Sequence, residues 1–186
     1  MFVANTTPDM DNLNYIKQHK GRQDLPGEHI WGDLGQILLF ICFFSIWIVD
    51  SFVVHYSTFL SDRISWIIRI PVAIVILFFS SYLARSGLKI VFGNERETPV
   101  IIREGVFNLV RHPIYLGAIL LYLGLIILTF SILSAAFWIV IILFYYFISK
   151  YEEKILLNQF GDDYQKYIDD VPMFIPYIFR RRKNQQ

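Results

Sequence analysis

The chain has 186 residues, and 55% of them are hydrophobic. Because a soluble domain of this length rarely carries so many apolar residues, the composition predicts an integral membrane protein. The formal net charge of +1 gives no electrostatic basis for a nucleic-acid partner, and the single cysteine, Cys42, excludes an internal disulfide.

Residues 1–33 are polar and form the first predicted segment, a cytoplasmic N-terminal stretch without an early apolar block. This pattern argues against a cleaved signal peptide. Asp33, followed three residues later by Gln36, is typical of a helix N-cap with its reciprocal partner. Residues 27–33 also suit a segment that folds over a site, but the capping interpretation is favoured.

Two apolar runs follow, at residues 34–54 and 64–84, and each is close to the roughly 20 residues that cross a bilayer core. Together they form the second predicted segment, a transmembrane helix pair covering residues 34–84. Asp50 lies late in the first run, and Arg69 lies early in the second. A helical hairpin brings both charges to one face of the membrane, where they either pair or reach the interface separately.

A longer run without any charge extends over residues 114–148. At about 1.5 Å per residue, a single helix of this length reaches roughly 50 Å, whereas a bilayer core is about 30 Å thick. The run is therefore predicted to be two helices with a turn near residues 129–134, where small polar residues gather. This hairpin returns His112 and Glu152 to the same side, and it belongs to the third segment, residues 85–186.

The distribution of positive charge predicts the orientation. Only Arg63 lies between the first two spans. Apart from Arg69 within the second span, the other cations gather before the spans, in the long loop and in the tail: Lys17, Lys20, Arg22, Arg85, Lys89, Arg96, Arg103, Arg111, Lys150, Lys154, Lys166, Arg180, Arg181, Arg182 and Lys183. By the positive-inside rule, both termini and the long loop face the cytoplasm. The predicted fold is an all-α integral membrane protein with about four transmembrane helices, a C-terminal helical hairpin and a cytoplasmic cofactor pocket. The lack of eukaryotic sorting signals favours a prokaryotic cell membrane.

The stretch GVFNLVRHPIY, residues 105–115, leads into the long apolar run. Arg111 and His112 are its last polar residues, and Pro113 suits the first position of a helix. The free N–H groups near Tyr115 then point back toward these two side chains, and a helix N-terminus beside an arginine attracts anions. The alternative is a membrane boundary, in which the arginine snorkels and the tyrosine joins the interfacial belt.

Three further motifs follow the apolar run: a glutamate pair at residues 152–153, FGDDYQKY at residues 160–167 and VPMFIP at residues 171–176. The aromatic residues of the second motif have helical spacing and are expected to pack inside the fold. Together with RHPIY at residues 111–115, the order of these motifs resembles the isoprenylcysteine carboxyl methyltransferase and phospholipid methyltransferase superfamily. The resemblance covers roughly residues 85–178. It implies a membrane-embedded methyltransferase that uses S-adenosylmethionine and acts on a lipid-like or prenylated acceptor.

The cofactor of such an enzyme carries groups of opposite charge. Its carboxylate suits the helix start at Pro113 with Arg111 or His112 nearby, and its ammonium or ribose hydroxyls suit the glutamate pair. The resemblance implies that the cofactor is held by the segment before RHPIY, by the end of that motif and by the glutamates, namely Val100, Ile101, Ile102, Phe107, His112, Pro113, Ile114, Tyr115, Glu152 and Glu153. The family often has a histidine where this chain has Pro99, and a tyrosine where it has Phe107.

The resemblance is incomplete at the end of the last long helix. Isoprenylcysteine enzymes carry an arginine there, four residues before the glutamates, whereas this chain reads FYYFIS at residues 144–149. The missing cation argues against a prenylcysteine carboxylate as the acceptor. Tyr145 and Tyr146 are the predicted acceptor-binding residues, because aromatic faces near a membrane suit an apolar or cationic head group.

Neither a metal site nor a catalytic base can be assigned from the sequence. His19, His29 and His55 are scattered without ligand spacing. For an acceptor that arrives protonated, Glu153 and His112 are the only candidate bases near the predicted site. Two other interpretations stay open. One is a sterol-reductase-like membrane oxidoreductase that uses NADPH, since that C-terminal region also has an arginine-histidine-proline helix start; the other is a non-catalytic membrane protein on the same fold.

Overall fold

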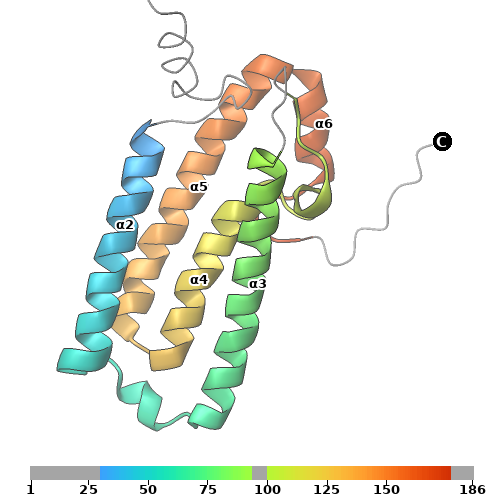
Figure 1. The fold of residues 1–186 in the computed structure, drawn as a ribbon. Helices are drawn as coiled ribbons and strands as arrows, with labels where there is room; N and C mark the ends of the chain where they lie inside the picture. Colours follow the sequence, from blue (N-terminus) through green and yellow to red (C-terminus); the bar gives the residue numbers. More distant parts are fainter. Residues whose placement is uncertain (1–29, 94–99, 177–186) are drawn as a thin grey trace, which may run out of the picture.

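The computed structural model describes residues 30–93 and 100–176 (Figure 1). Within these two ranges the chain forms helices joined by turns and contains no β-strand, which confirms the all-α prediction. The elements are α2 (Ile30–Ile48), the π-helix η1 (Val49–Val54), the 3₁₀-helix η2 (Phe59–Asp62), α3 (Trp66–Phe92), the 3₁₀-helix η3 (Gly105–Asn108), α4 (Pro113–Thr129), α5 (Ile132–Phe160) and α6 (Asp162–Asp170).

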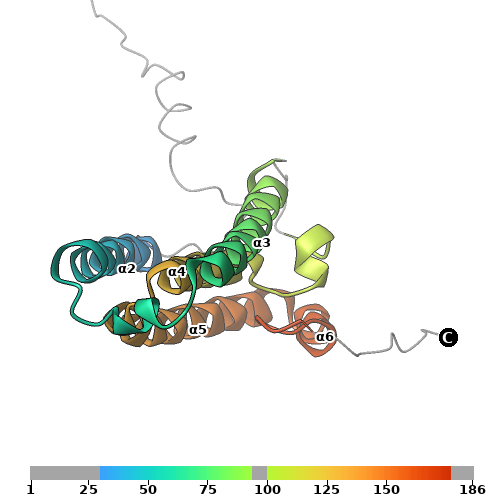
Figure 2. The same cartoon turned by 90° about the horizontal axis from the view of Figure 1, so that it is seen from below.

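The long helices α2, α3, α4 and α5 lie side by side and alternate in direction (Figure 1). α4 packs between α3 and α5, and α2 packs against α5 (Figure 2). The short helix α6 folds back beside the C-terminal end of α5. The C-terminal ends of α3 and α5 therefore meet the N-terminal end of α4 at one end of the bundle.

Three described helices are long and apolar enough to cross a membrane, in the spans Leu34–Val54, Trp66–Phe92 and Ile132–Phe160. The first has the bounds that the sequence predicts. α3 continues past its predicted end at residue 84, because long cationic side chains can stay on an exposed helix surface without ending the helix. α4 is apolar but shorter, with 17 residues. These helices confirm an integral membrane protein.

The turn between α4 and α5 falls in the predicted range. α4 ends at Thr129, and the next residue, Phe130, has a left-handed backbone with φ of 52°. Ser131 then caps α5, because its hydroxyl accepts the Ser134 N–H at 3.1 Å. A left-handed residue ends one helix, and the capping hydroxyl satisfies a free amide of the next. The predicted helical hairpin is confirmed.

The predicted N-cap at Asp33 is wrong. α2 begins at Ile30, so Asp33 lies inside the first turn of the helix. An acidic residue is favourable anywhere in the first turn, because the helix dipole is positive there, and the sequence pattern therefore does not locate the boundary to a single residue. Residues 27–29, the rest of the segment considered as a cover for a site, lie outside the described residues.

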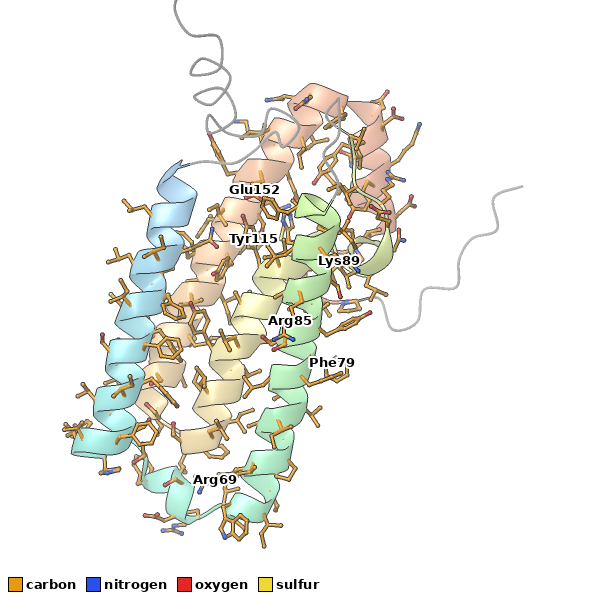
Figure 3. The ribbon with its side chains drawn as sticks, in the orientation of Figure 1. Arg69, Phe79, Arg85, Lys89, Tyr115 and Glu152 are labelled. Carbon is orange, nitrogen blue, oxygen red and sulfur yellow. The ribbon has the colours of Figure 1, made fainter. Side chains whose placement is uncertain are left out.

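Asp50 and Arg69 lie at the same end of the bundle but do not pair. Asp50 is buried and accepts hydrogen bonds from the Ser57 amide and from the hydroxyls of Ser57 and Ser131. Arg69 donates from Nη1 to the Leu128 carbonyl at 3.2 Å, and Figure 3 shows Arg69 far from Glu152, toward the other end of the bundle. Each charge therefore ties a different segment to the region around the α4–α5 turn, at the end opposite the candidate site.

Small residues let α3 and α4 approach closely. The Ser80 hydroxyl donates to the Gly117 carbonyl at 2.7 Å. A Cβ added at Gly117 lies 3.0 Å from the Ser80 carbonyl oxygen and 3.1 Å from the Ala84 amide nitrogen, so no larger residue fits without a shift of the backbone. On its other side, α4 contributes Tyr122 to a core shared with Tyr145 of α5. Both contacts hold the N-terminal turn of α4 on a rigid scaffold.

Candidate functional site

The candidate site is built at the start of α4. Pro113 occupies the first helical position, and His112 precedes it as the N-cap residue. The His112 carbonyl accepts the Leu116 N–H at 3.0 Å and so closes the first turn. Proline is favoured at this position because its φ is already helical and its missing N–H has no helical partner there. The predicted helix start is confirmed, and it places His112 where loop and helix meet.

The last turns of α5 bring the glutamate pair to His112, and Figure 3 shows Glu152 of α5 near Tyr115 of α4. Glu152 Oε2 lies 3.6 Å from His112 Nδ1, and the other oxygen of Glu152 accepts a hydrogen bond from the Tyr115 hydroxyl. Glu153 Oε1 lies 3.4 Å from His112 Nε2. The rings of His112 and Tyr115 are stacked, with 5.7 Å between centroids and 4° between planes. These four residues form one group, the His–Tyr–Glu cluster.

Arg111 is buried and is bound by other parts of the protein. Its Nε and Nη2 each lie 2.7 Å from Glu153 Oε1. Its Nη1 donates to the Ile168 carbonyl at 3.0 Å and to the Val171 carbonyl. Lys150 Nζ lies 3.2 Å from the second oxygen of Glu153. The structure therefore pairs Arg111 with Glu153, because a buried charge is stable only when it is paired, and the predicted cofactor-binding role of Arg111 stays a prediction.

The residues after α6 pair with the backbone of the RHP motif. The Arg111 N–H donates to the Pro172 carbonyl at 2.9 Å, and the His112 N–H donates to the Met173 carbonyl at 3.3 Å. The Phe174 ring lies 6.0 Å from the His112 ring. Pro172, Met173 and Phe174 therefore form a C-terminal strap that holds one side of His112. The VPMFIP motif marks this segment in the sequence, but the motif does not indicate what the segment contacts.

Burial lowers the pKa of His112, because desolvation disfavours the imidazolium and outweighs the opposing attraction of Glu153. The residue is 8% exposed. His112 is therefore neutral at pH 7, so one ring nitrogen carries a proton and the other has a free lone pair. A neutral imidazole next to two carboxylates can bind a ligand group or take up a proton from one.

α6 holds the loop that precedes α4. Tyr164 and Tyr167 are both 3% exposed and pack with Val171 and Ile101. The Tyr167 hydroxyl donates to the Phe107 carbonyl at 2.7 Å, and burial raises the pKa of Tyr167, so the hydroxyl keeps its proton. The predicted packing role of these tyrosines is confirmed. Their contacts also hold in place Ile101 and Phe107, two of the predicted cofactor-binding residues.

Val100 and Ile102 belong to the same extended segment before η3, and Ile114 lies in the first turn of α4. Val100 is 46% exposed, and the other two are partly buried. Their cofactor-binding role stays a prediction. Within residues 30–93 and 100–176, no group of three or more histidine, cysteine or acidic side chains is arranged to hold a metal ion.

The two predicted acceptor-binding tyrosines lie on different faces of α5. Tyr145 is 3% exposed, and its ring lies 5.2 Å from the Tyr115 ring. Tyr146 is 42% exposed on the outer surface. Consecutive residues of an α-helix point about 100° apart, so they cannot both face the same pocket. The structure brings Tyr145 to the His–Tyr–Glu cluster but not Tyr146.

Comparison with known proteins places the chain among methyltransferases. A family model described as phospholipid methyltransferase matches residues 66–163. The chain is 30% identical over 108 residues to methanethiol S-methyltransferase 2 of Bradyrhizobium diazoefficiens, covering 55% of this chain and 37% of that protein. It is 30% identical over 95 residues to protein-S-isoprenylcysteine O-methyltransferase B of Arabidopsis thaliana, covering 50% and 48%. It is 29% identical over 141 residues to methanethiol S-methyltransferase of Crocosphaera subtropica, covering 74% and 53%.

The chain thus spans about half or less of the length of these relatives. The family model, however, covers more than half of this chain, from the start of α3 to the start of α6. The matched region includes the RHP helix start and both glutamates of the His–Tyr–Glu cluster. The chain belongs to the phospholipid methyltransferase family, and the superfamily resemblance expected from its motifs is confirmed.

Proposed function

We propose that this protein is a membrane-embedded methyltransferase that uses S-adenosylmethionine and acts on a lipid-like acceptor. The observation that carries the proposal is the contact of His112 and Tyr115, at the start of α4, with Glu152 of α5. This contact brings a helix N-terminus next to an acidic side chain. The helix N-terminus favours a carboxylate, and the acidic side chain favours an ammonium or ribose hydroxyls. The relatives named as methyltransferases support the same reaction class.

The residues of the cluster fit such a cofactor chemically. The first turn of α4 lies at the positive end of the helix dipole, which favours an anionic group such as the cofactor carboxylate. The Glu152 side chain is 21% exposed and so lies within reach of a ligand. Val100 and Phe107 supply apolar surface of the kind that binds an adenine ring. When the cofactor is bound, its sulfonium supplies the methyl group.

Methyl transfer from a sulfonium is an in-line displacement, so the protein has to align the two reactants and exclude water. The close packing at Gly117 and the C-terminal strap hold the start of α4 rigidly for this purpose. Glu153 is already paired with Arg111 and Lys150. Of the two candidate bases, we therefore assign His112 as the group that takes a proton from a protonated acceptor.

We further propose that the acceptor lacks a carboxylate. Residues 144–149 contain no cation, and Lys150 Nζ already lies 3.2 Å from Glu153. A desolvated carboxylate without a partner would cost several kcal/mol. Tyr145, next to Tyr115, presents an aromatic surface that suits an apolar or cationic group better.

The topology belongs to the same proposal. At about 1.5 Å per residue, α4 reaches roughly 25 Å, which is enough for a fourth, short span. From the positive charges we propose that both termini and the cofactor pocket face the cytoplasm, and that the membrane is a prokaryotic cell membrane. We keep the division into residues 1–33, 34–84 and 85–186 as a proposal, and the family match that begins at residue 66 adds α3 to the catalytic part.

Binding of radiolabelled S-adenosylmethionine to detergent-purified protein tests the proposal, with NADPH as the competing ligand. We expect saturable binding of the methyl donor that weakens in Glu152→Gln. Lys166→Gln, which changes an exposed residue of α6, is the control and should bind as the wild type does. Binding of NADPH without the methyl donor would indicate a reductase, and binding of neither would indicate a non-catalytic protein.

A further inference from the structure

α3 carries a stripe of exposed side chains on the side turned away from α4. The α3 stripe consists of Phe78, Tyr82, Arg85 and Lys89. The steps between them are four, three and four residues, so they share one face of the helix. The other face carries the small residues Ala84 and Gly87, which pack on α4. The stripe therefore faces the surrounding membrane, not the bundle.

The two cations of the α3 stripe lie close to the level at which α4 begins. Gly87, halfway between Arg85 and Lys89, packs on the first turn of α4, where an added Cβ lies 2.7 Å from Ile114 Cγ1. At about 1.5 Å per residue, Arg85 lies roughly 3 Å to the apolar side of this level and Lys89 roughly 3 Å to the polar side. Figure 3 shows both in the half of α3 that is nearer the candidate site. They therefore straddle the edge of the apolar layer.

Arg85 and Lys89 form no ion pair with any acidic side chain in residues 30–93 and 100–176. A cation that faces lipid without a counter-charge is costly, and an anion from the membrane would neutralise it. The two side chains start about 6 Å apart along the helix and are long enough to converge on one anion. At this depth, the available anion is a lipid phosphate.

We propose that the α3 stripe binds one phospholipid molecule, with its phosphate between Arg85 and Lys89 and an acyl chain along Phe78 and Tyr82. Phe78 is 66% exposed and Tyr82 is 52% exposed, and both lie on the apolar side of the two cations. The stripe thus has the polarity of a lipid in the adjacent leaflet, with a charged end at the interface and an apolar end toward the membrane centre. This site lies outside the His–Tyr–Glu cluster and does not depend on methyl transfer.

Native mass spectrometry of the full chain in detergent tests this site. The added lipids are phosphatidylglycerol and, separately, monogalactosyldiacylglycerol, which has acyl chains but no phosphate. We expect the wild type to retain one phosphatidylglycerol in preference to the glycolipid. The double variant Arg85→Gln/Lys89→Gln should lower the affinity for phosphatidylglycerol roughly tenfold or more and leave retention of the glycolipid unchanged.

Arg63→Gln/Lys166→Gln is the matched control, because it removes the same charge from exposed positions on other elements. It should bind phosphatidylglycerol as the wild type does. Phe78→Ala/Tyr82→Ala should lower the retention of both lipids. The helical circular dichroism and thermal midpoint of each variant show that it is folded. Equal affinity for phosphatidylglycerol in the wild type and in the Arg85/Lys89 double variant, or no preference over the glycolipid in the wild type, would overturn the proposal.

Discussion

Two adjacent glutamates of α5 have different surroundings. Glu153 is 2% exposed, and its carboxylate is held by Arg111 and Lys150. The Glu152 side chain is 21% exposed and contacts Tyr115 and His112. The difference arises because neighbouring helix positions point about 100° apart. We infer that Glu153 serves stability and that Glu152 serves ligand binding.

The substitution Glu152→Gln is expected to weaken S-adenosylmethionine binding about ten- to a hundredfold, because it removes a charge-assisted hydrogen bond worth roughly 1.5–3 kcal/mol. Isothermal titration calorimetry measures this change. Glu153→Gln is the matched comparison. It leaves Arg111 buried without its counter-charge and should cost about 3–5 kcal/mol of stability. The division of roles is wrong if Glu152→Gln binds like the wild type or destabilises the protein as much as Glu153→Gln does.

The lowered pKa of His112 predicts a stability that depends on pH. The charged groups that face this imidazole are Arg111, Lys150, Glu152 and Glu153. Below the ordinary histidine pKa of about 6.5, His112 is protonated in the unfolded chain, whereas burial keeps it neutral in the folded protein. The contribution of His112 to the free energy of unfolding is therefore fully present above this pH. It is lost as the pH falls toward the folded-state pKa of His112. We expect the thermal midpoint in detergent to decrease between about pH 7.5 and pH 5.5.

The variant His112→Asn should show a smaller decrease over the same pH range, because it removes the titrating group. His55→Asn is its control, since His55 is exposed at the opposite end of the bundle and has a left-handed backbone that asparagine tolerates. The control should keep the wild-type decrease. An identical decrease in both variants would show that other groups cause the pH dependence.

At the scale of elements, the C-terminal strap depends on Arg111. The guanidinium joins Glu153 of α5 to the Ile168 carbonyl of α6 and to the Val171 carbonyl just before the strap. A planar guanidinium can hold these partners at once, whereas a lysine ammonium can hold fewer in the same geometry. We therefore propose that Arg111 positions His112 through the strap.

Hydrogen exchange measured by mass spectrometry tests this positioning role. The amides of Arg111 and His112 donate to the strap, so we expect their exchange to accelerate in Arg111→Gln and to be intermediate in Arg111→Lys. Arg103→Gln removes an exposed arginine that contacts Asp170 at 3.8 Å, and it should leave this exchange unchanged. If both amides in Arg111→Gln exchanged as slowly as in the wild type, the positioning role of Arg111 would be contradicted.

At the scale of the whole molecule, every motif residue lies at one end of the bundle, and the distribution of positive charge supports our proposal that this end faces the cytoplasm. In a Cys42→Ser background, we expect a cysteine introduced by Asn94→Cys to resist a membrane-impermeant thiol reagent in intact cells. A cysteine introduced by Ser61→Cys, in the connection between α2 and α3, should be labelled. Labelling of the first variant from outside would overturn the proposed orientation.

Binding of the proposed acceptor also depends on the whole molecule, because several helices determine which charges lie near Tyr145. We expect weak or no methyl-ester formation on acetyl-farnesylcysteine by the purified protein and better transfer to amine- or hydroxyl-bearing lipids. The reason is that residues 144–149 contain no cation and that Lys150 already contacts Glu153, so neither balances a carboxylate. Robust, saturable methylation of acetyl-farnesylcysteine would show that another part of the chain supplies this charge.

The sequence alone determined the class of protein, the bounds of the first span, the helix start at Pro113 and the turn after Thr129. These features depend on the polarity and backbone preferences of neighbouring residues, so they can be read within a short window. The order of the motifs also indicated the family. The error at Asp33 has the same origin, because an acidic residue suits both the cap and the first turn.

Only the tertiary structure decided which motif residues contact one another. The rotation of α4 is set by the close contact of Gly117 with Ser80, and the opposing face of α5 is set by its buried residues. Short-range patterns carry no information about this rotation. The rotation pairs Arg111 with Glu153 and leaves Glu152 beside Tyr115. For the same reason, a strap more than 50 residues further along the chain docks on His112, because long-range packing decides where its backbone hydrogen bonds are satisfied.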